Sequence, residues 1–142
     1  MRKDLSIDDL DGLVDRPLVA TLATYRKDGS VLLSPVWFEW RDGGFSVTTA
    51  TDDVKARHLR RDPRVSIVVY EHEPPYRGLE LRATARLQTE GLEETRVRIA
   101  VKYLGEHKGR EYAGTIEGDE VIIRLEPGEL RTWDFKDEYL LG

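Results

Sequence analysis

Cysteine is absent from this chain of 142 residues. Its absence excludes disulfides, thiolate metal sites and a cysteine nucleophile, and it fits the reducing environment of the cytoplasm. Apolar runs long enough to span a membrane are also missing. The segment Met1–Ser6 leads into aspartates rather than into the apolar core of a signal peptide. We therefore expect a cytoplasmic protein with no membrane partner.

The chain also lacks an excess of basic residues. It carries 22 lysines and arginines against 27 aspartates and glutamates, and its formal net charge is -5. Nucleic-acid binders usually carry a clear basic excess, so this composition argues against a nucleic-acid partner. A small anionic ligand fits the composition better.

Common catalytic motifs are missing as well. The sequence contains no G-x-S-x-G, no G-x-x-x-x-G-K-[ST] and no G-x-G-x-x-G pattern, which leaves nucleophilic hydrolysis and standard nucleotide-loop chemistry without support. His58, His72 and His107 are scattered without metal-ligand spacing, so we predict no metal site. Glu71 and Glu73 flank the end of a predicted strand, where carboxylates are usually solvated, and we assign neither a catalytic role.

The patterns that are present predict a mainly β domain, residues 1–142. Apolar runs and period-two alternation predict strands at 18–25, 31–40, 45–50, 64–71, 79–87, 120–125 and 130–135. The run 64–71 is nearly continuous in apolar residues and is expected to be buried on both faces. Helices are expected at 7–15, 91–104 and before Pro63, and 106–118 is open between a second short helix and a loop. The last two strands are separated by a Pro127–Gly128 turn. The sum is a small closed or half-open β-barrel with accessory helices.

One predicted strand carries a proline. Pro35 lies within the run 31–40, and proline has no N–H for a central sheet ladder. This strand should therefore be an edge, be bulged, or face something other than a strand, such as a flat ligand. Alternation places Trp37 on the opposite face from Phe38 and Trp40. Such aromatics are more often core than cofactor contacts, but an interface or a ligand would account for the two-sided lining.

A polar turn followed by a short basic helix is the best candidate for chemistry. The turn holds the hydroxyls of Thr48, Thr49 and Thr51, and Asp52 or Asp53 is the expected N-cap. Unpaired N–H groups and the helix dipole favour phosphate at such a turn. The basic side chains that follow are Lys55, Arg57, Arg60, Arg61 and Arg64. His58 comes three residues after Lys55 and should share its helical face. The alternative is a solvated basic face with no ligand.

Several segments follow one another in the order seen in a known superfamily. They are Leu22–Thr24, Asp28–Ser30, Leu33–Phe38, Phe45–Thr49, Lys55–Val65 and Pro75–Ala85. On this set, which spans roughly Arg16 to Leu125, the chain resembles the pyridoxamine 5'-phosphate oxidase-like superfamily. It is most similar to the actinobacterial-type branch to which F420-dependent enzymes are assigned.

The resemblance implies an FMN-binding type of split β-barrel, a homodimer with two flavin or deazaflavin sites at the subunit interface. It implies a phosphate site at Thr48, Thr49, Lys55 and Arg57 and a ring site along the strand segment 34–37. It also implies that the segment 76–78 reaches each site from the partner subunit. Together with His58, the expected cofactor residues are Ser34, Pro35, Val36, Trp37, Thr48, Thr49, Lys55, Arg57, Tyr76, Arg77 and Gly78. Related sequences often carry a base where this chain has Asp52 and Asp53.

The leading hypothesis is an F420-dependent oxidoreductase that transfers a hydride between the deazaflavin and a small unsaturated or conjugated molecule. An FMN-dependent oxidase or reductase of the pyridoxamine-phosphate-oxidase-like type is one alternative. A non-catalytic carrier or sensor that binds a flavin is another. No residue stands out as an obligatory acid, and Tyr76 and solvent are the candidates.

Overall fold

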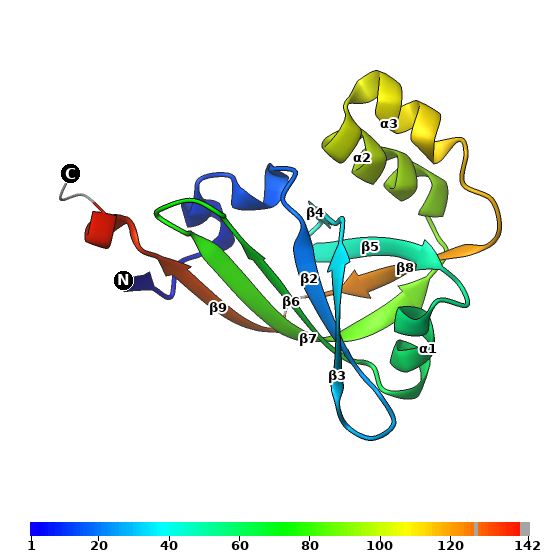
Figure 1. Ribbon diagram of the computed structural model, residues 1–142, viewed down its shortest axis with the longest axis horizontal. Helices are drawn as coiled ribbons and strands as arrows, with labels where there is room; N and C mark the ends of the chain where they lie inside the picture. The colour runs from blue at the N-terminus through cyan, green and yellow to red at the C-terminus, as the bar shows by residue number, and fades with distance from the viewer. Residues whose placement is uncertain (127, 140–142) are drawn as a thin grey trace.

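The strands of the chain curl into a single antiparallel half-barrel (Figure 1). The computed structural model describes residues 1–126 and 128–139. Within them, nine strands form one sheet in the order β3-β2-β6-β7-β8-β5-β4, with β9 paired to β7 and β1 paired to β9. The strands are β1 (Arg2–Lys3), β2 (Ala20–Tyr25), β3 (Val31–Val36), β4 (Glu39–Arg41), β5 (Gly44–Ala50), β6 (Arg64–Tyr70), β7 (Gly78–Gln88), β8 (Glu120–Leu125) and β9 (Glu129–Asp134). The mainly β barrel expected from the sequence is confirmed.

Strand β7 connects the two halves of the sheet. Its first seven residues pair with β6, and Ala85 to Gln88 pair with β8. Leu79 and Leu81 are buried, while Arg82 and Thr84 between the apolar positions are exposed. The period-two pattern thus places one face of β7 on the core, as the sequence predicts.

Three α-helices cover parts of the barrel. They are α1 (Val54–Arg61), α2 (Leu92–Leu104) and α3 (Glu106–Ala113), so the open stretch 106–118 contains a second short helix. Helices α2 and α3 form a hairpin beside β5 and β8, and α1 lies at the lower right of the barrel in Figure 1. A Cβ on Gly109 would lie 2.5 Å from the Cα of Val101, so glycine permits the close contact of α2 and α3. No helix in the described part of the chain is long and apolar enough to cross a membrane.

The helix expected at 7–15 is wrong. The structure has two 3-10 turns instead, η1 (Ile7–Leu10) and η2 (Leu13–Asp15). Asp11 and Gly12 separate them with φ values of 56° and 71°, and two consecutive left-handed residues cannot continue a right-handed helix. Leu10 and Leu13 are nevertheless fully buried, because the sharp bend points both into the core.

The strand expected at 31–40 is divided in two. Strand β3 pairs with β2, whereas β4 pairs with β5, and the chain changes partner at Trp37 and Phe38. Strand β3 is an edge of the sheet, which tolerates Pro35 as predicted. The aromatic rings separate as the alternation indicates: Phe38 and Trp40 both pack on Phe45 in the core, and Trp37 faces the helical hairpin.

Strand β6 is buried on one face only, which corrects the expectation for 64–71. Val65, Ile67 and Val69 are at most 2% exposed, but Ser66 and Val68 are only half-buried. The outer face of β6 has no covering layer in the described chain, so an apolar run does not bury both faces here. Pro127 of the expected last turn lies outside the described residues.

Candidate functional site

A pocket of about 260 Å³ lies at the open seam of the barrel, between the free edge strand β3 and strand β5. Its lining residues are Pro35, Val36, Trp37, Val47, Thr48, Lys55 and Ile99. Because β3 and β5 do not pair, the edge of β3 leaves backbone polar groups without sheet partners. The strand, turn and helix that the sequence singled out therefore meet at one place, which we call the seam pocket.

The aromatic wall of the seam pocket is held by α2. Trp37 stacks on Tyr103 with ring centroids 4.7 Å apart and planes 5° apart. The Tyr103 hydroxyl donates a hydrogen bond to the Leu18 carbonyl at 2.7 Å and accepts one from the Phe38 N–H at 3.2 Å. Burial raises the pKa of Tyr103 to about 12, so the hydroxyl keeps its proton. The indole is therefore fixed in place.

Tyr103 and Ile99 belong to the helix expected at 91–104, to which the sequence analysis gave no part in the site. The sequence analysis missed their place beside Trp37 at the seam pocket. Helical periodicity predicts which residues share a face of a helix, but it carries no information on which strand lies opposite.

The end of the seam pocket at which the sequence predicts a phosphate, which we call the phosphate end, holds Thr48 and Lys55, and Asp53 lies next to them. Asp53 is the N-cap residue of α1, but its carboxylate does not cap the helix. It accepts hydrogen bonds from the Lys55 ammonium at 2.5 Å and from the Thr49 hydroxyl at 2.8 Å. The bond from Lys55 is the main cause that lowers the pKa of Asp53, so the carboxylate is ionised at neutral pH. Of the two adjacent threonines only Thr48 lines the pocket, and Ser34, which precedes Pro35 on β3, does not line it.

Arg57 and His58 lie on another face of α1. Both line a separate pocket of about 420 Å³, and neither lines the seam pocket. The Nδ1 atom of His58 lies 3.0 Å from the hydroxyl of the fully buried Thr24. The expectation that His58 and Lys55 reach one ligand from a shared helical face is therefore not met within a single pocket. Their assignment to the cofactor stays a prediction.

Tyr76, Arg77 and Gly78 lie before and at the start of β7, and none of them lines the seam pocket of the same chain. Tyr76 is 36% exposed and packs edge-on against Tyr139 with ring centroids 5.8 Å apart. A Cβ on Gly78 would lie 2.5 Å from the Trp133 ring, so this strand start needs glycine. Their arrival at the site from a partner subunit stays a prediction.

Arg77 belongs to a buried ionic cluster. Its guanidinium contacts Glu71 and Asp134, each at 3.1 Å, and Glu71 also accepts a hydrogen bond from Arg16 at 2.6 Å. Glu71 is only 5% exposed, so the expectation of a solvated carboxylate is wrong for this residue. A strand end is usually wet, but here Arg16 and Arg77 cover it and compensate the buried charge.

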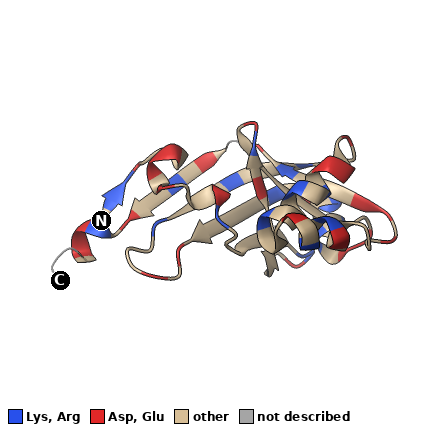
Figure 2. Cartoon of the chain, turned by 90° about the horizontal axis from the view of Figure 1, so that it is seen from above, with Lys and Arg blue, Asp and Glu red and all other residues tan. Residues whose placement is uncertain are grey.

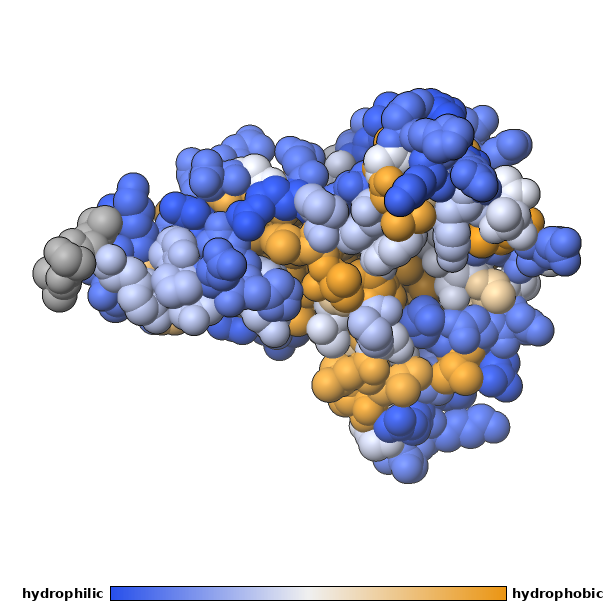
Figure 3. Space-filling view, turned by 45° about the horizontal axis from the view of Figure 1, so that its top comes forward, coloured by the Kyte–Doolittle hydropathy of each residue, from blue (hydrophilic) through white to orange (hydrophobic). Residues whose placement is uncertain are grey.

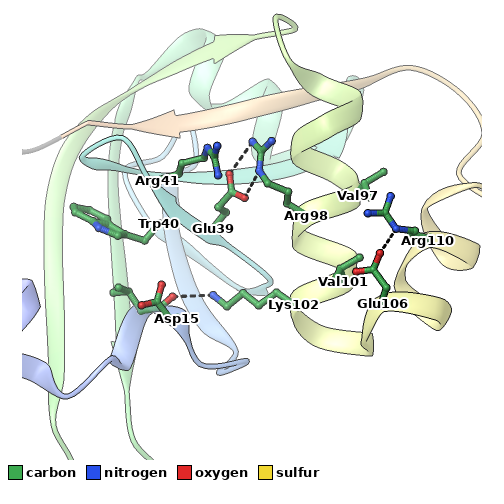
Figure 4. A pocket seen from close by; sticks show the side chains of 11 residues that line it. Asp15, Glu39, Trp40, Arg41, Val97, Arg98, Val101, Lys102, Glu106 and Arg110 are labelled. Carbon is green, nitrogen blue, oxygen red and sulfur yellow. Dashed lines mark hydrogen bonds and ion pairs between the residues drawn. The ribbon is translucent and has the colours of Figure 1, made fainter.

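A larger pocket of about 520 Å³ lies between η2, β4 and the α2–α3 hairpin (Figure 4). Arg98 donates to both carboxylate oxygens of Glu39 at 2.6 and 3.1 Å. The Lys102 ammonium donates to the carbonyls of Val14 and Phe38, each at 3.0 Å, and lies 3.6 Å from the centre of the Phe38 ring. Burial lowers the pKa of Lys102 to about 8. These contacts fasten α2 to the connection that carries Trp37.

The arrangement of the seam, with a flat aromatic wall at one end and an ammonium and a hydroxyl at the other, suits a planar ring that carries a phosphate. The family model described as Pyridoxamine 5'-phosphate oxidase matches residues 7–134. The chain belongs to the pyridoxamine 5'-phosphate oxidase family. Membership in this family of flavin-binding oxidoreductases confirms the resemblance carried by the ordered segments.

Solved structures of this family are similar to the chain over most of its length. The conserved hypothetical protein Rv2991 from Mycobacterium tuberculosis is 26% identical, with a TM-score of 0.84 over 97% of this chain and 90% of that one. A structure named F420 Reductase is 26% identical, with a TM-score of 0.69 over 84% of this chain and 94% of that one. A FAD-binding protein from Mesorhizobium loti, 20% identical with a TM-score of 0.67 over 92% and 93%, shares the fold. The comparison with curated proteins found no match.

Proposed function

We propose that the protein is an F420-dependent oxidoreductase whose cofactor binds in the seam pocket. The observation that carries this proposal is the meeting of Pro35, Trp37, Thr48 and Lys55 in one pocket, from two strands and a helix. The 26% identity to a structure named F420 Reductase supports the deazaflavin over other flavins. The substrate would be a small unsaturated or conjugated molecule.

The residues of the seam pocket fit the parts of such a cofactor. Val36, Val47 and Ile99 supply an apolar lining, and the fixed indole of Trp37 supplies a flat wall for a ring system. Lys55 supplies a positive charge for a phosphate, and Thr48 supplies a hydroxyl donor. When bound, a flavin or deazaflavin supplies hydride transfer at its ring. The protein orients the ring against the substrate and excludes water from the wall it covers.

The pocket of one chain is small for this ligand. Its volume of about 260 Å³ lies below the roughly 300 to 1,000 Å³ of ligand sites that enclose a whole small molecule. We therefore propose that a second copy of the chain completes each site, and that Tyr76, Arg77 and Gly78 of that copy approach the bound ring. This homodimer would hold two equivalent sites.

Exposed apolar side chains on the outer face of the sheet support the dimer. Val31 is 42% exposed, Leu33 65% and Tyr70 41%, and the strand pairing places all three on the same face as Val68. Figure 3 shows hydrophobic residues in the middle of the visible surface and on its lower lobe. A patch of this kind on an otherwise charged protein marks a protein contact surface.

An FMN-dependent oxidase or reductase is the second candidate, because the seam pocket presents one lysine, which suits a single terminal phosphate. A non-catalytic flavin carrier or sensor is the third. It is favoured by the lining of the seam pocket, in which Lys55 is the single ionisable side chain.

The first test is a fluorescence titration of the purified protein with F420 and, in parallel, with FMN. We expect F420 to bind more tightly, followed by turnover with conjugated acceptors such as enones and quinones. Tighter binding of FMN would identify FMN, and not F420, as the cofactor. Cofactor binding without turnover of any acceptor would support the non-catalytic carrier or sensor. If neither cofactor binds, the assignment of the seam pocket is refuted.

The second test isolates the phosphate end. Lys55→Met removes one charge-assisted hydrogen bond and should weaken cofactor binding about 10- to 150-fold. Arg60→Met removes the same charge from an exposed position on α1 that lines neither pocket and should leave affinity within about twofold. Equal losses in the two variants would show that general charge attraction, not a Lys55 contact, holds the cofactor.

Asp53 gives a test of opposite sign. Its carboxylate forms an ion pair with the Lys55 ammonium and places a negative charge at the phosphate end. Asp53→Asn keeps the shape of the side chain, removes the repulsion and should tighten cofactor binding several-fold. Weaker binding by this variant would show that the carboxylate holds Lys55 in the binding position.

A further inference from the structure

The pocket on the other side of α1 has an unusual lining. It has a volume of about 420 Å³ and is formed by the turn between β2 and β3 together with one face of α1. Its lining residues are Arg26, Lys27, Val54, Arg57, His58 and Arg61. Four of the six are permanently cationic at neutral pH and none is acidic, although the chain has a net charge of -5. We call this the cationic pocket.

The four cations of this pocket are not neutralised inside the described chain. Acidic and basic residues are interspersed along the chain (Figure 2), and most arginines of the described residues form ion pairs. Within residues 1–126 and 128–139, no carboxylate lies within 4.0 Å of the charged groups of Arg26, Lys27, Arg57 or Arg61. Asp28 in the same turn has its carboxylate bonded to the N–H and hydroxyl of Ser30 at 2.9 and 2.6 Å.

Two of the guanidinium groups are held in position by the backbone. Arg61 donates to the Tyr25 carbonyl at 2.5 Å, and Arg26 donates to the Val31 carbonyl at 2.9 Å. Each arginine therefore keeps further N–H groups for a ligand. Anchored arginines lose less side-chain entropy on binding than free ones, which favours them as phosphate ligands.

The pKa of His58 reflects both its burial and the positive charges around it. Desolvation, followed by the charges of Arg61, Arg26 and Arg57, lowers the pKa of its imidazole. Its Nδ1 atom lies against the Thr24 hydroxyl, and none of the hydrogen bonds found in the described chain reaches its Nε2 atom. A neutral imidazole beside three guanidinium groups is the expected state where positive potential is strong and no anion balances it.

We propose that the cationic pocket binds a small multivalent phosphate, at a site separate from the cofactor phosphate at Lys55. Guanidinium groups pair with phosphate oxygens through two parallel N–H bonds, and three arginines and a lysine line this pocket. A single phosphate cannot balance four cations, so a chain of two or three phosphates fits the charge better. The stems of the arginines and Val54 form the floor beneath it.

The test uses calorimetric titration of the wild-type protein with inorganic tripolyphosphate, with inorganic phosphate as the weaker comparison. Arg57→Gln and Arg61→Gln should each weaken tripolyphosphate binding roughly fivefold or more, because each removes a ligand of the phosphate. Arg60→Gln is the matched control: it removes the same charge from the same helix at an exposed position outside the pocket. Thermal unfolding of each variant checks that the fold is intact.

The outcomes separate this proposal from the proposed function. Binding that survives Lys55→Met and saturation with FMN or F420 supports a separate site. Loss of binding in Lys55→Met, or competition by the cofactor, would assign Arg57 and Arg61 to the cofactor phosphate and overturn it. Equal weakening by Arg60→Gln would show that the general positive charge of α1, and not the cationic pocket, attracts tripolyphosphate. Absence of binding at millimolar tripolyphosphate would refute the proposal.

Discussion

The stack of Tyr103 on Trp37 gives the sharpest prediction, because one side chain supports both the fold and the seam pocket. Tyr103 belongs to α2, whereas its hydroxyl contacts Leu18 before β2 and Phe38 before β4. Tyr103→Phe keeps the ring stack and removes both hydrogen bonds. Tyr103→Leu removes the hydrogen bonds and the stack together.

The magnitudes follow from these contacts. Leaving a buried donor or acceptor without its partner costs roughly 1 to 3 kcal/mol, so Tyr103→Phe should lower the free energy of unfolding by about 2 to 4 kcal/mol. The stack contributes roughly 0.5 to 1.5 kcal/mol more, which Tyr103→Leu should lose in addition. A double-mutant cycle with Trp37→Leu should recover this second quantity as a coupling energy.

Urea unfolding followed by far-UV circular dichroism measures both free energies, and near-UV dichroism of the native state reports the Trp37–Tyr103 stack directly. We expect the near-UV signal and cofactor affinity to persist in Tyr103→Phe and to fall in Tyr103→Leu. A Tyr103→Phe variant within about 0.5 kcal/mol of wild type would refute the assigned role of the hydroxyl. Unchanged cofactor affinity in Tyr103→Leu would refute the role of the stacked indole.

Three further predictions concern the core, the sheet surface and pH. Phe45 is fully buried between Phe38 and Trp40, and Phe45→Ala should cost about 3 to 5 kcal/mol in urea unfolding; a loss below 1 kcal/mol would contradict the packing. Leu33→Asp changes a side chain that is 65% exposed, so light scattering should show a monomer while the fold persists, and an unchanged mass would place the interface elsewhere. The pKa of Lys102 is about 8 in the folded chain against an ordinary 10.5. Since the unfolded chain binds more protons between these values, stability should rise with pH across this window. Urea unfolding at several pH values should show that Lys102→Met removes the rise, and a rise that persists would contradict it.

Much of the fold could be predicted from the sequence, because strand patterns are local. The alternation of β7 and the proline on the edge strand β3 depend on neighbouring residues in the chain, and both are confirmed. The expected helix at 7–15 failed for a local reason too: the apolar spacing is helical, but Asp11 and Gly12 adopt left-handed φ values that end it. The spacing of apolar residues carries no information on such a change of backbone conformation.

The candidate site was predicted in part. The local order of Pro35, Trp37, Thr48 and Lys55 identified the residues that meet at the seam. The separation of Arg57 into another pocket depends on how α1 docks against the β2–β3 turn, which helical periodicity leaves undetermined. The family itself could be recognised from the ordered segments, because those segments carry the strand ends and turns that build the fold.

The sequence by itself therefore determined the β-rich pattern, the polar turn before α1 and the family. The tertiary structure decided which side chains meet across long separations, such as Trp37 with Tyr103 and Glu71 with Arg77 and the distant Asp134. The physical reason is that local pattern fixes the face of a strand or helix on which a residue lies. The curl of the sheet and the docking of each helix choose the partner opposite that face, and many residues far apart contribute to both.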